Sequence, residues 1–251
     1  MDLDLQDRVF VVTGGARGLG RATAECLVAE GARVVLSGRS QESLEAAAAA
    51  LGDQAVTVVA DNADPGTPDR LVTTARERWG RLDGALISVG GPPKGAVTDI
   101  SDEQWTTAFA SVFLGAVRLA REIGQVLPTG GALALVLSSS VKAPLAEMAL
   151  SNGLRPGLAM VAKTLADELG PRGVRVNGLL PGRVGTERVA ELDASSGDPQ
   201  AAKEAALRTI PLGRYGEPAE FGRAAAFLLS PAASFVSGAM LPVDGGMLRS
   251  L

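Results

Sequence analysis

Short, almost entirely apolar runs alternate with longer amphipathic or alanine-rich segments along the whole chain. Parallel strands that are covered on both faces are apolar throughout, so these runs are expected to be strands of that kind. The predicted strands are Arg8–Thr13, Arg33–Ser37, Ala55–Ala60, Ala85–Ser88, Ala132–Leu137, Val174–Leu180 and Ala239–Val243. The predicted helices cover residues 18–30, 40–51, 65–80, 101–127, 153–169 and 217–229. This alternation predicts one α/β domain over residues 1–251: a doubly wound, mostly parallel seven-stranded sheet with helices on both faces.

The segment Asp193–Pro199 (DASSGDP) is the most loop-like part of the chain and follows the sixth predicted strand. In an open α/β sheet, ligands bind outside the carboxyl ends of the strands. An insertion at residues 185–210 is therefore expected to be either a lid over a substrate or a mobile surface loop.

Composition narrows the function classes. Apolar residues make up 46% of the chain and charged residues 21%, which excludes intrinsic disorder. A formal net charge of −4 argues against a nucleic-acid groove or an anionic membrane as the main partner. The single cysteine, Cys26, cannot form an internal disulfide. The chain has 0 histidines, so His-based triads and zinc-hydrolase sites are not expected, and we predict no metal.

The N-terminal sequence MDLDLQDRVF carries acidic residues where a signal peptide would be basic. No charge-free apolar stretch reaches the roughly 18 residues that a membrane span requires. A cytoplasmic protein is therefore expected.

A glycine-rich turn follows the first predicted strand and leads into a predicted helix. It runs from Thr13 through Gly14, Gly18 and Gly20, with the spacing TGxxxGxG. Glycines there let the backbone approach a pyrophosphate, which the helix N-terminus attracts. A tight turn alone would account for a glycine cluster, but its position after the first strand of an α/β pattern predicts dinucleotide binding.

This spacing resembles the short-chain dehydrogenase/reductase family, in particular its 3-oxoacyl-ACP-reductase-like members. Further landmarks of that family follow in order: Asp61-Asn62, Arg175-Val176-Asn177, Pro181-Gly182 with Thr186, Pro211–Arg214 and Val243–Gly246. The resemblance implies a Rossmann-type domain with a nicotinamide cofactor. The cofactor contacts that it implies are Thr13, Gly14, Arg17, Gly18, Leu19, Gly20, Arg39, Asp61, Asn62, Gly90, Arg155, Pro181, Gly182, Val184 and Thr186.

The charge after the second predicted strand distinguishes the two nicotinamide cofactors. An NAD site needs a carboxylate there for the ribose 2′-hydroxyl, whereas a 2′-phosphate needs arginine. The strand ends Ser37-Gly38-Arg39-Ser40, with no acid, and Arg17 adds a second cation inside the glycine turn. The two arginines together favour NADP(H).

The catalytic end departs from the family pattern, which has a Tyr, a Lys four residues later, a Ser and an Asn. Alignment of Leu165–Leu169 with the family's LALEL segment puts the Tyr position at Ser151 and the Lys position at Arg155. The Asn position, counted from Trp105, is Val112. Only the serine remains, within Ser138-Ser139-Ser140, where Ser139 is the best match. The only tyrosine, Tyr215, lies in the Pro211–Pro218 loop.

These replacements change the acid–base chemistry that is available. A serine hydroxyl is a poor acid, and an arginine stays protonated, so neither replaces the Tyr–Lys pair in proton transfer. Other candidate proton donors are Lys142, Lys94 and Glu147, although a solvated loop charge is the better interpretation of each of them. A water held by Ser139 and Ser151 is a further candidate.

Pro156 follows Arg155 directly and lacks a backbone N–H. We therefore expect the helix around it to begin late, near Asn152–Leu154, or to kink.

Two hypotheses follow. The first is an NADP(H)-dependent oxidoreductase with altered catalytic residues Ser139, Ser151 and Arg155, which acts on a small carbonyl or alcohol substrate. The second is a non-catalytic dinucleotide-binding protein, either a sensor or an inactive partner subunit. The family resemblance also implies a homodimer or homotetramer, for which Ala108–Ala120 and Phe221–Leu229 offer helix faces.

Overall fold

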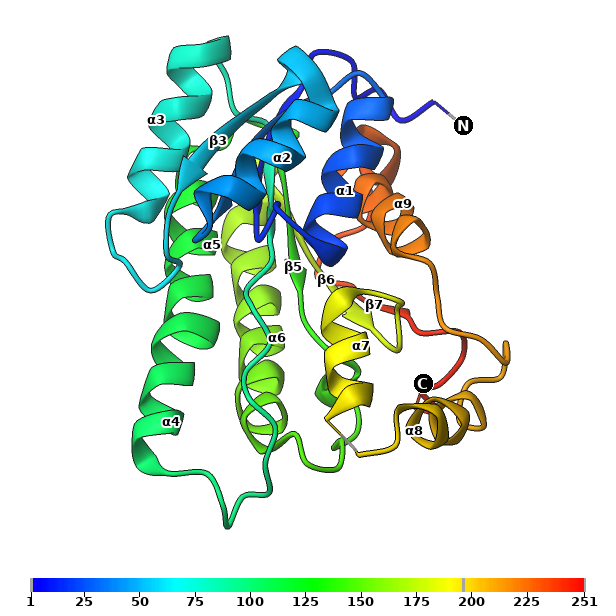
Figure 1. Cartoon of the computed structure of the whole chain (residues 1–251). Coiled ribbons are helices and arrows are strands. Elements are labelled where there is room, and N and C mark those ends of the chain that lie inside the picture. Colours follow the sequence, from blue (N-terminus) through cyan, green and yellow to red (C-terminus); the bar gives the residue numbers. More distant parts are fainter. Residues whose placement is uncertain (1, 196, 251) are drawn as a thin grey trace.

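The computed structural model of the chain describes residues 2–195 and 197–250 (Figure 1). Its strands form one seven-stranded sheet in the order β3-β2-β1-β4-β5-β6-β7. Every neighbouring pair is parallel, and no strand is antiparallel among the described residues. The strands are β1 (Val9–Thr13), β2 (Arg33–Gly38), β3 (Ala55–Val59), β4 (Gly84–Ile87), β5 (Ala132–Val136), β6 (Arg175–Pro181) and β7 (Met240–Val243). The predicted doubly wound sheet is confirmed.

Helices cover both faces of this sheet. They are α1 (Gly18–Ala29), α2 (Gln41–Leu51), α3 (Thr67–Trp79), α4 (Asp102–Ala108), α5 (Gly115–Val126), α6 (Ala149–Leu169), α7 (Glu187–Ala194), α8 (Pro199–Leu207) and α9 (Pro218–Leu229). Helices α1, α2 and α9 pack on one face, and α3, α5 and α6 on the other (Figure 1). The long helix that was predicted over residues 101–127 consists of α4, a π-helical turn Phe109–Leu114 and α5.

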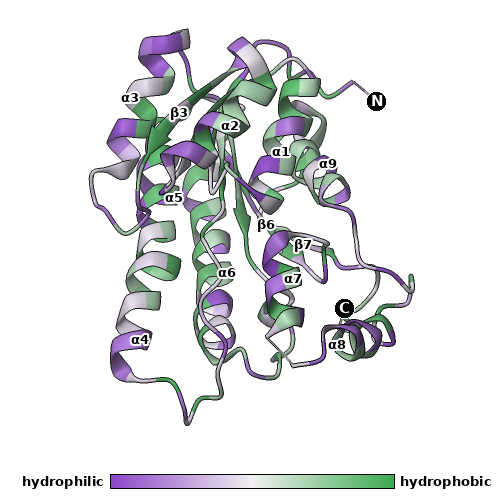
Figure 2. Ribbon diagram, in the orientation of Figure 1, coloured by the Kyte–Doolittle hydropathy of each residue, from purple (hydrophilic) through white to green (hydrophobic). Residues whose placement is uncertain are grey.

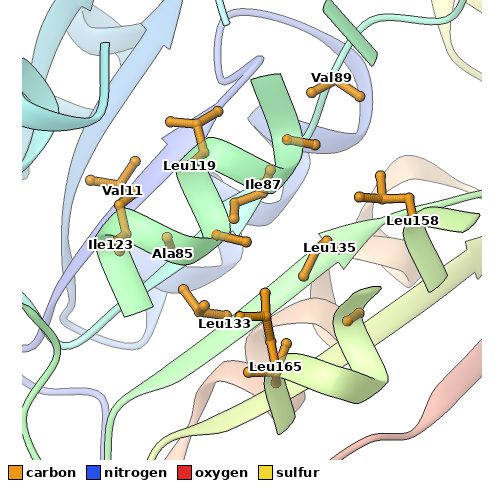
Figure 3. Packing of buried hydrophobic residues seen from close by; sticks show 14 of the residues in the cluster. Val11, Ala85, Ile87, Val89, Leu119, Ile123, Leu133, Leu135, Leu158 and Leu165 are labelled. Carbon is orange, nitrogen blue, oxygen red and sulfur yellow. The ribbon is translucent and has the colours of Figure 1, made fainter. Parts of the chain in front are cut away.

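Two hydrophobic clusters, one on each face of the sheet, form the core. Phe10 and Val11 are adjacent on β1 and both fully buried, but they belong to different clusters because strand side chains alternate between faces. The cluster against α5 and α6 is drawn in Figure 3, with labels on Val11, Ala85, Ile87, Val89, Leu119, Ile123, Leu133, Leu135, Leu158 and Leu165. Burial of each leucine contributes roughly 2 kcal/mol to folding.

Hydropathy follows the same layers. Figure 2 shows hydrophilic residues on the outward side of helix α3 and hydrophobic residues on the strands between the helix layers. Within residues 2–195 and 197–250, no helix has both the length and the apolar character that a membrane crossing requires.

Helix α6 differs from the sequence prediction at its start. It begins at Ala149 and runs through Pro156, so the expected late start near Asn152–Leu154 is wrong. The Asn152 side chain accepts the Leu145 N–H at 3.0 Å and donates to the Leu145 carbonyl at 2.8 Å. These two bonds join the preceding loop to the first turn of α6. They stabilise that turn, which lies before Pro156.

Residues 185–210 are more ordered than a loop. Helix α7 includes Asp193 and helix α8 begins at Pro199, so both ends of the loop-like stretch Asp193–Pro199 are helical. Thr186 and Asp198 cap these helices by accepting backbone N–H bonds from Val189 and Ala201. Ser196, in the middle of the stretch, lies outside the described residues.

Candidate active site

A cleft runs along the carboxyl ends of the strands. It consists of two adjoining pockets of about 670 and 690 Å³, both of which are lined by Gly14, Arg17, Ser88 and residues 90–92. We call the first pocket the β2 side, because residues after β2 and β3 line it, and the second the β5 side. The two pockets meet between β1 and β4, where the strand order reverses, which is the usual ligand position in such sheets.

The glycine turn between β1 and α1 forms a backbone cradle in this cleft. Gly14 and Gly18 adopt left-handed φ angles of +60° and +54°, which other residues rarely accept. Gly20 packs so closely on the Gly14 carbonyl that a Cβ atom would clash with it. Arg17, the N-cap of α1, makes no side-chain hydrogen bond to the first helical turn. The first N–H groups of the helix therefore remain available, so the cradle fits a pyrophosphate.

Thr13 holds the strands together and does not line the cleft. Its hydroxyl donates to the Ser88 carbonyl at 2.9 Å and accepts the Ser88 N–H at 2.8 Å. The bonds join the carboxyl ends of β1 and β4 beside the glycine turn. Thr13 thus differs from the other predicted cofactor contacts, all of which line one of the two pockets.

Two arginines, and no acidic residue of β2 or of the turn after it, line the cleft where β2 ends. Arg39 is exposed, lines the β2 side and forms no hydrogen bond or ion pair with any described residue. Arg17 donates to the Ser43 hydroxyl at 3.0 Å and lies 3.5 Å from the Glu187 carboxylate. Both members of that ion pair are more than half exposed, so it holds Arg17 only weakly. Arg39 and Arg17 can therefore bind a phosphate.

A π-helical turn lines the β2 side opposite these arginines. It contains Val112, at the predicted position of the family's Asn, and this valine is buried and lines this side. Its neighbour Ser111 donates its hydroxyl to the Thr107 carbonyl at 3.0 Å, within its own helix. Neither side chain therefore replaces the Asn as an amide hydrogen-bonding group.

Buried hydroxyls follow β5. Ser139 is 2% exposed and lines the β5 side from a short 3-10 turn. Ser140 and Ser151, both buried, share a hydrogen bond of 3.0 Å between their hydroxyl oxygens. The sequence singled out Ser139 and Ser151, which both line the β5 side, but the Ser140–Ser151 pair depends on a contact between a turn and a helix that no sequence pattern reveals.

Arg155 lies one helical turn after Ser151 and is 4% exposed. Its Nη1 donates to the Val136 carbonyl at 2.6 Å and its Nη2 to the Val89 carbonyl at 3.4 Å. Its Nε has no hydrogen-bond partner among the described residues, and no carboxylate of that part of the chain lies within ion-pair distance of the guanidinium. Burial lowers the pKa of Arg155 to about 10, so the side chain remains positive at neutral pH.

Helix α7 is tied to the opposite wall of the cleft. Lys94, in the β4–α4 loop, donates to the Leu192 carbonyl at 2.6 Å and to the Ser195 hydroxyl at 2.9 Å. Arg188 of α7 donates to the Pro92 carbonyl at 2.9 Å. These bonds cross the β5 side, so the ammonium group of Lys94 holds this closed arrangement together and is a poor candidate for proton transfer.

The other potential proton donors differ in whether they line the cleft. Tyr215 lines neither pocket and donates its hydroxyl to Asp193 at 3.0 Å; burial and this bond raise its pKa. Lys142 also lines neither pocket. Glu147 lines the β5 side with a left-handed φ of +55°, and its carbonyl accepts the Gly95 N–H at 2.9 Å. Met247, which the sequence did not indicate, reaches the same pocket from the C-terminal segment.

A protein-family model described as enoyl-(acyl carrier protein) reductase matches residues 14–248. The chain belongs to the short-chain dehydrogenase/reductase family. It is 33% identical to levodione reductase of Leifsonia aquatica over 260 residues, covering 96% of this chain and 94% of that protein. It is 33% identical to L-rhamnose 1-dehydrogenase (NAD(P)(+)) of Azotobacter vinelandii, covering 98% of this chain and 99% of that protein.

Solved structures agree with these relatives. The L-sorbose reductase of Gluconobacter frateurii, crystallised with NADPH and L-sorbose, superimposes with a TM-score of 0.92 at 29% identity over 100% of both chains. The relatives are oxidoreductases, as the resemblance in the sequence implied. Among the described residues of this family member, no group of His, Cys, Asp and Glu side chains is placed to hold a metal ion.

Proposed function

We propose that this protein is an NADP(H)-dependent oxidoreductase that transfers hydride between the nicotinamide and a small carbonyl or alcohol substrate, with altered proton-transfer residues. The observation that carries the proposal is the single cleft with a phosphate cradle at one end and buried hydroxyls at the other. Two of the relatives are named for different substrates, levodione and L-rhamnose.

The cofactor would lie along the whole cleft. The Gly14–Gly20 turn would bind the pyrophosphate, and Arg17 and Arg39 the 2′-phosphate of the adenosine ribose. Asp61 and Asn62 line the β2 side, where the adenine would lie. The residues that line the β5 side, where the nicotinamide would lie, include Gly90, Arg155, Pro181, Gly182, Val184 and Thr186. The NADPH in the sorbose reductase structure supports this choice of cofactor.

The bound dinucleotide supplies or accepts the hydride, and the chain's own groups act on the substrate oxygen. The Ser139 hydroxyl donates a hydrogen bond to that oxygen, and the positive charge of Arg155 favours the negative charge that develops on it. The proton comes from a water that Ser139 and Ser151 hold. Ser140 orients Ser151 through the bond of 3.0 Å between their hydroxyl oxygens.

Turnover should be slow by the standards of positioned acid catalysis. A well-placed general acid contributes about 10²–10⁴-fold to such reactions. A water held by serines is less acidic and less firmly positioned than a phenol beside a lysine. The remaining rate would come from orientation of the substrate and from hydrogen bonds to its oxygen.

A second candidate is a non-catalytic dinucleotide-binding protein, either a sensor or an inactive partner subunit. One observation favours it: the two replaced residues are tied to the protein itself. Arg155 donates to two backbone carbonyls, and Ser151 pairs with Ser140. A site that is retained only for nucleotide binding would show this arrangement.

An assay of NADPH oxidation on a panel of ketones, aldehydes and 3-oxoacyl compounds, run beside a calorimetric titration of NADPH, separates these candidates. Turnover that falls tenfold or more in Ser139→Ala, but not in the exposed control Ser234→Ala, supports the oxidoreductase. NADPH binding without turnover on any compound supports the non-catalytic protein. Absence of NADPH binding contradicts both.

Assembly as a homodimer or homotetramer stays a prediction of the family resemblance, and sedimentation equilibrium of the purified protein checks it. A cytoplasmic location stays a prediction from the sequence.

A further inference from the structure

Arg155 is a buried cation that the described chain does not neutralise. Its guanidinium rests on the carbonyls of Val136 and Val89, at the carboxyl ends of β5 and β4. Carbonyl dipoles stabilise a cation but leave its net charge in place. Ser151, at the position where the family has a Tyr, carries a hydroxyl that does not ionise near neutral pH, so it supplies no compensating negative charge.

Most of the other charged side chains that line the β5 side lie beside an opposite charge. Arg183 pairs with Asp193 at 3.0 Å, Arg188 lies 3.4 Å from Glu191, and Arg17 lies 3.5 Å from Glu187. Lys94, which bonds a carbonyl and a hydroxyl, is half-buried, and Glu147 is exposed. All of these side chains are more exposed to solvent than Arg155, whose relative exposure is 4%. Water and counterions screen exposed charges strongly and buried ones much less. Arg155 is the most deeply buried of the charges that line this pocket, so its field is the least screened.

The contacts of Arg155 hold its guanidinium against the backbone. Its Nε is buried, and one N–H of each Nη donates to a carbonyl, from Val136 of β5 and from Val89 just after β4. A carboxylate in the pocket could not reach Nε without displacing these contacts. Arg155 is therefore suited to act through its field on whatever occupies the β5 side.

We propose that Arg155 makes the cleft select the reduced dinucleotide, so that NADPH binds more tightly than NADP⁺. The inference rests on the proposed function, which places the nicotinamide on the β5 side. The nicotinamide ring is neutral when reduced and carries one positive charge when oxidised. The two forms have the same phosphates and adenosine, so the ratio of their dissociation constants reports how the pocket interacts with the ring, and the change of that ratio in an Arg155 variant reports the part due to Arg155.

The expected ratio is about tenfold. Two unit charges roughly 10 Å apart, at an effective dielectric constant of about 20, change a binding constant by about that factor. A tenfold preference for the reduced form corresponds to a rise of about 30 mV in the midpoint potential of the bound two-electron couple. The protein would then favour reduction of carbonyls or, without catalysis, would report the ratio of NADPH to NADP⁺.

The test is a calorimetric titration of the full-length protein with NADPH and, separately, with NADP⁺. The measured ratio is the dissociation constant of NADP⁺ divided by that of NADPH. In Arg155→Met, which removes the charge, this ratio should fall about tenfold from that of the unmodified protein. Arg155→Lys is the matched control, because it keeps a positive charge near the same place and should keep the ratio. Circular dichroism checks that each variant is folded.

A second pair of variants tests the same charge without altering Arg155. Ser151 lies one turn before it on α6, so Ser151→Asp places a carboxylate beside the guanidinium and should reduce the ratio. Ser151→Asn is the matched control, because asparagine has nearly the same shape as aspartate but no charge, and it should leave the ratio unchanged.

The outcomes separate the two proposals. The role of Arg155 is overturned if the unmodified protein binds NADPH and NADP⁺ with similar dissociation constants. It is also overturned if the ratio is unchanged in both Arg155→Met and Ser151→Asp. In either case the binding of NADP(H) itself stands. A protein that binds neither form contradicts the proposed function as well. A ratio that follows the charge in both pairs of variants supports the inference.

Discussion

The two ends of the cleft use different parts of the chain to form a site. At the glycine turn the site consists mainly of backbone. Gly14 and Gly18, with their left-handed φ angles, and the open first turn of α1 form the cradle. On the β5 side the site consists of side chains, among them Ser151 and Arg155 at the predicted positions of the family's Tyr and Lys. The backbone there still follows the family fold, with a TM-score of 0.92 against the sorbose reductase.

This difference shows which changes the fold tolerates. A backbone cradle requires glycine, because a Cβ atom at Gly20 would overlap the Gly14 carbonyl. A side-chain site can change its chemistry while the backbone stays in place, provided that buried polar atoms find new partners. Ser151 finds Ser140, and Arg155 finds two carbonyls. Nucleotide binding is therefore expected to be retained in this chain, whereas proton transfer is expected to be altered.

The largest effect is expected from the glycine turn. Gly18→Val should abolish NADPH binding, by more than about 100-fold, because its φ of +54° strains a β-branched residue and the side chain blocks the backbone from the pyrophosphate. Calorimetry measures the loss. Gly170→Val is the control, since Gly170 has a φ of −53° and open space around it. Normal affinity in Gly18→Val would place the nucleotide elsewhere.

Restoring the family pattern on the β5 side should have the next largest effect. Ser151→Tyr combined with Arg155→Lys should raise kcat with NADPH about 100-fold, the lower end of what a positioned acid contributes. Both positions lie on α6 and line the same pocket, so a phenol can extend into the cleft. Ser151→Phe with Arg155→Lys is the matched control without the hydroxyl. Equal rates in the two double variants would mean that proton supply does not limit the reaction.

A charge reversal on the β2 side should change the choice of cofactor. Arg39→Asp should weaken NADPH binding about tenfold and make NADH the better ligand, because a carboxylate repels the 2′-phosphate and accepts a bond from a 2′-hydroxyl. Competitive titration with both dinucleotides measures the order. Arg78→Asp, an equal charge change on exposed α3, should leave the order intact. If the unmodified protein prefers NADH, the assignment of Arg39 is wrong.

The smallest effect is a flat pH profile. The chain has 0 histidines, and Arg155, with its pKa lowered to about 10, stays protonated below that pH. The kcat should therefore change less than about threefold between about pH 6 and pH 9. It should fall only as the pH rises through about 10, where the positive charge near the substrate oxygen is lost. A single titration inside the flat range would mean that a group other than Arg155 controls the reaction.

Much of the fold and half of the site could be predicted from the sequence. The apolar runs predicted all seven strands, within a residue or two at their ends, because strands buried on both faces must be apolar. The glycine turn and the missing acid after β2 were visible because their residues are consecutive. Helices α7 and α8 were missed: their short, polar sequences have no strong periodicity, and the Ser-Gly-Asp-Pro residues between them dominate the pattern.

The sequence by itself determined the succession of the seven strands, the position of the glycine turn and the predicted replacement of the family's Tyr and Lys by Ser151 and Arg155. Each of these depends on local residue spacing, which does not change when the chain folds. Only the tertiary structure decided that Thr13 bonds Ser88 and that Lys94 holds helix α7. It also decided that Arg155 is a buried charge resting on two strands. Those contacts join residues that are distant along the chain, and packing between strands, loops and helices selects them by shape, burial and the need of each buried polar group for a partner.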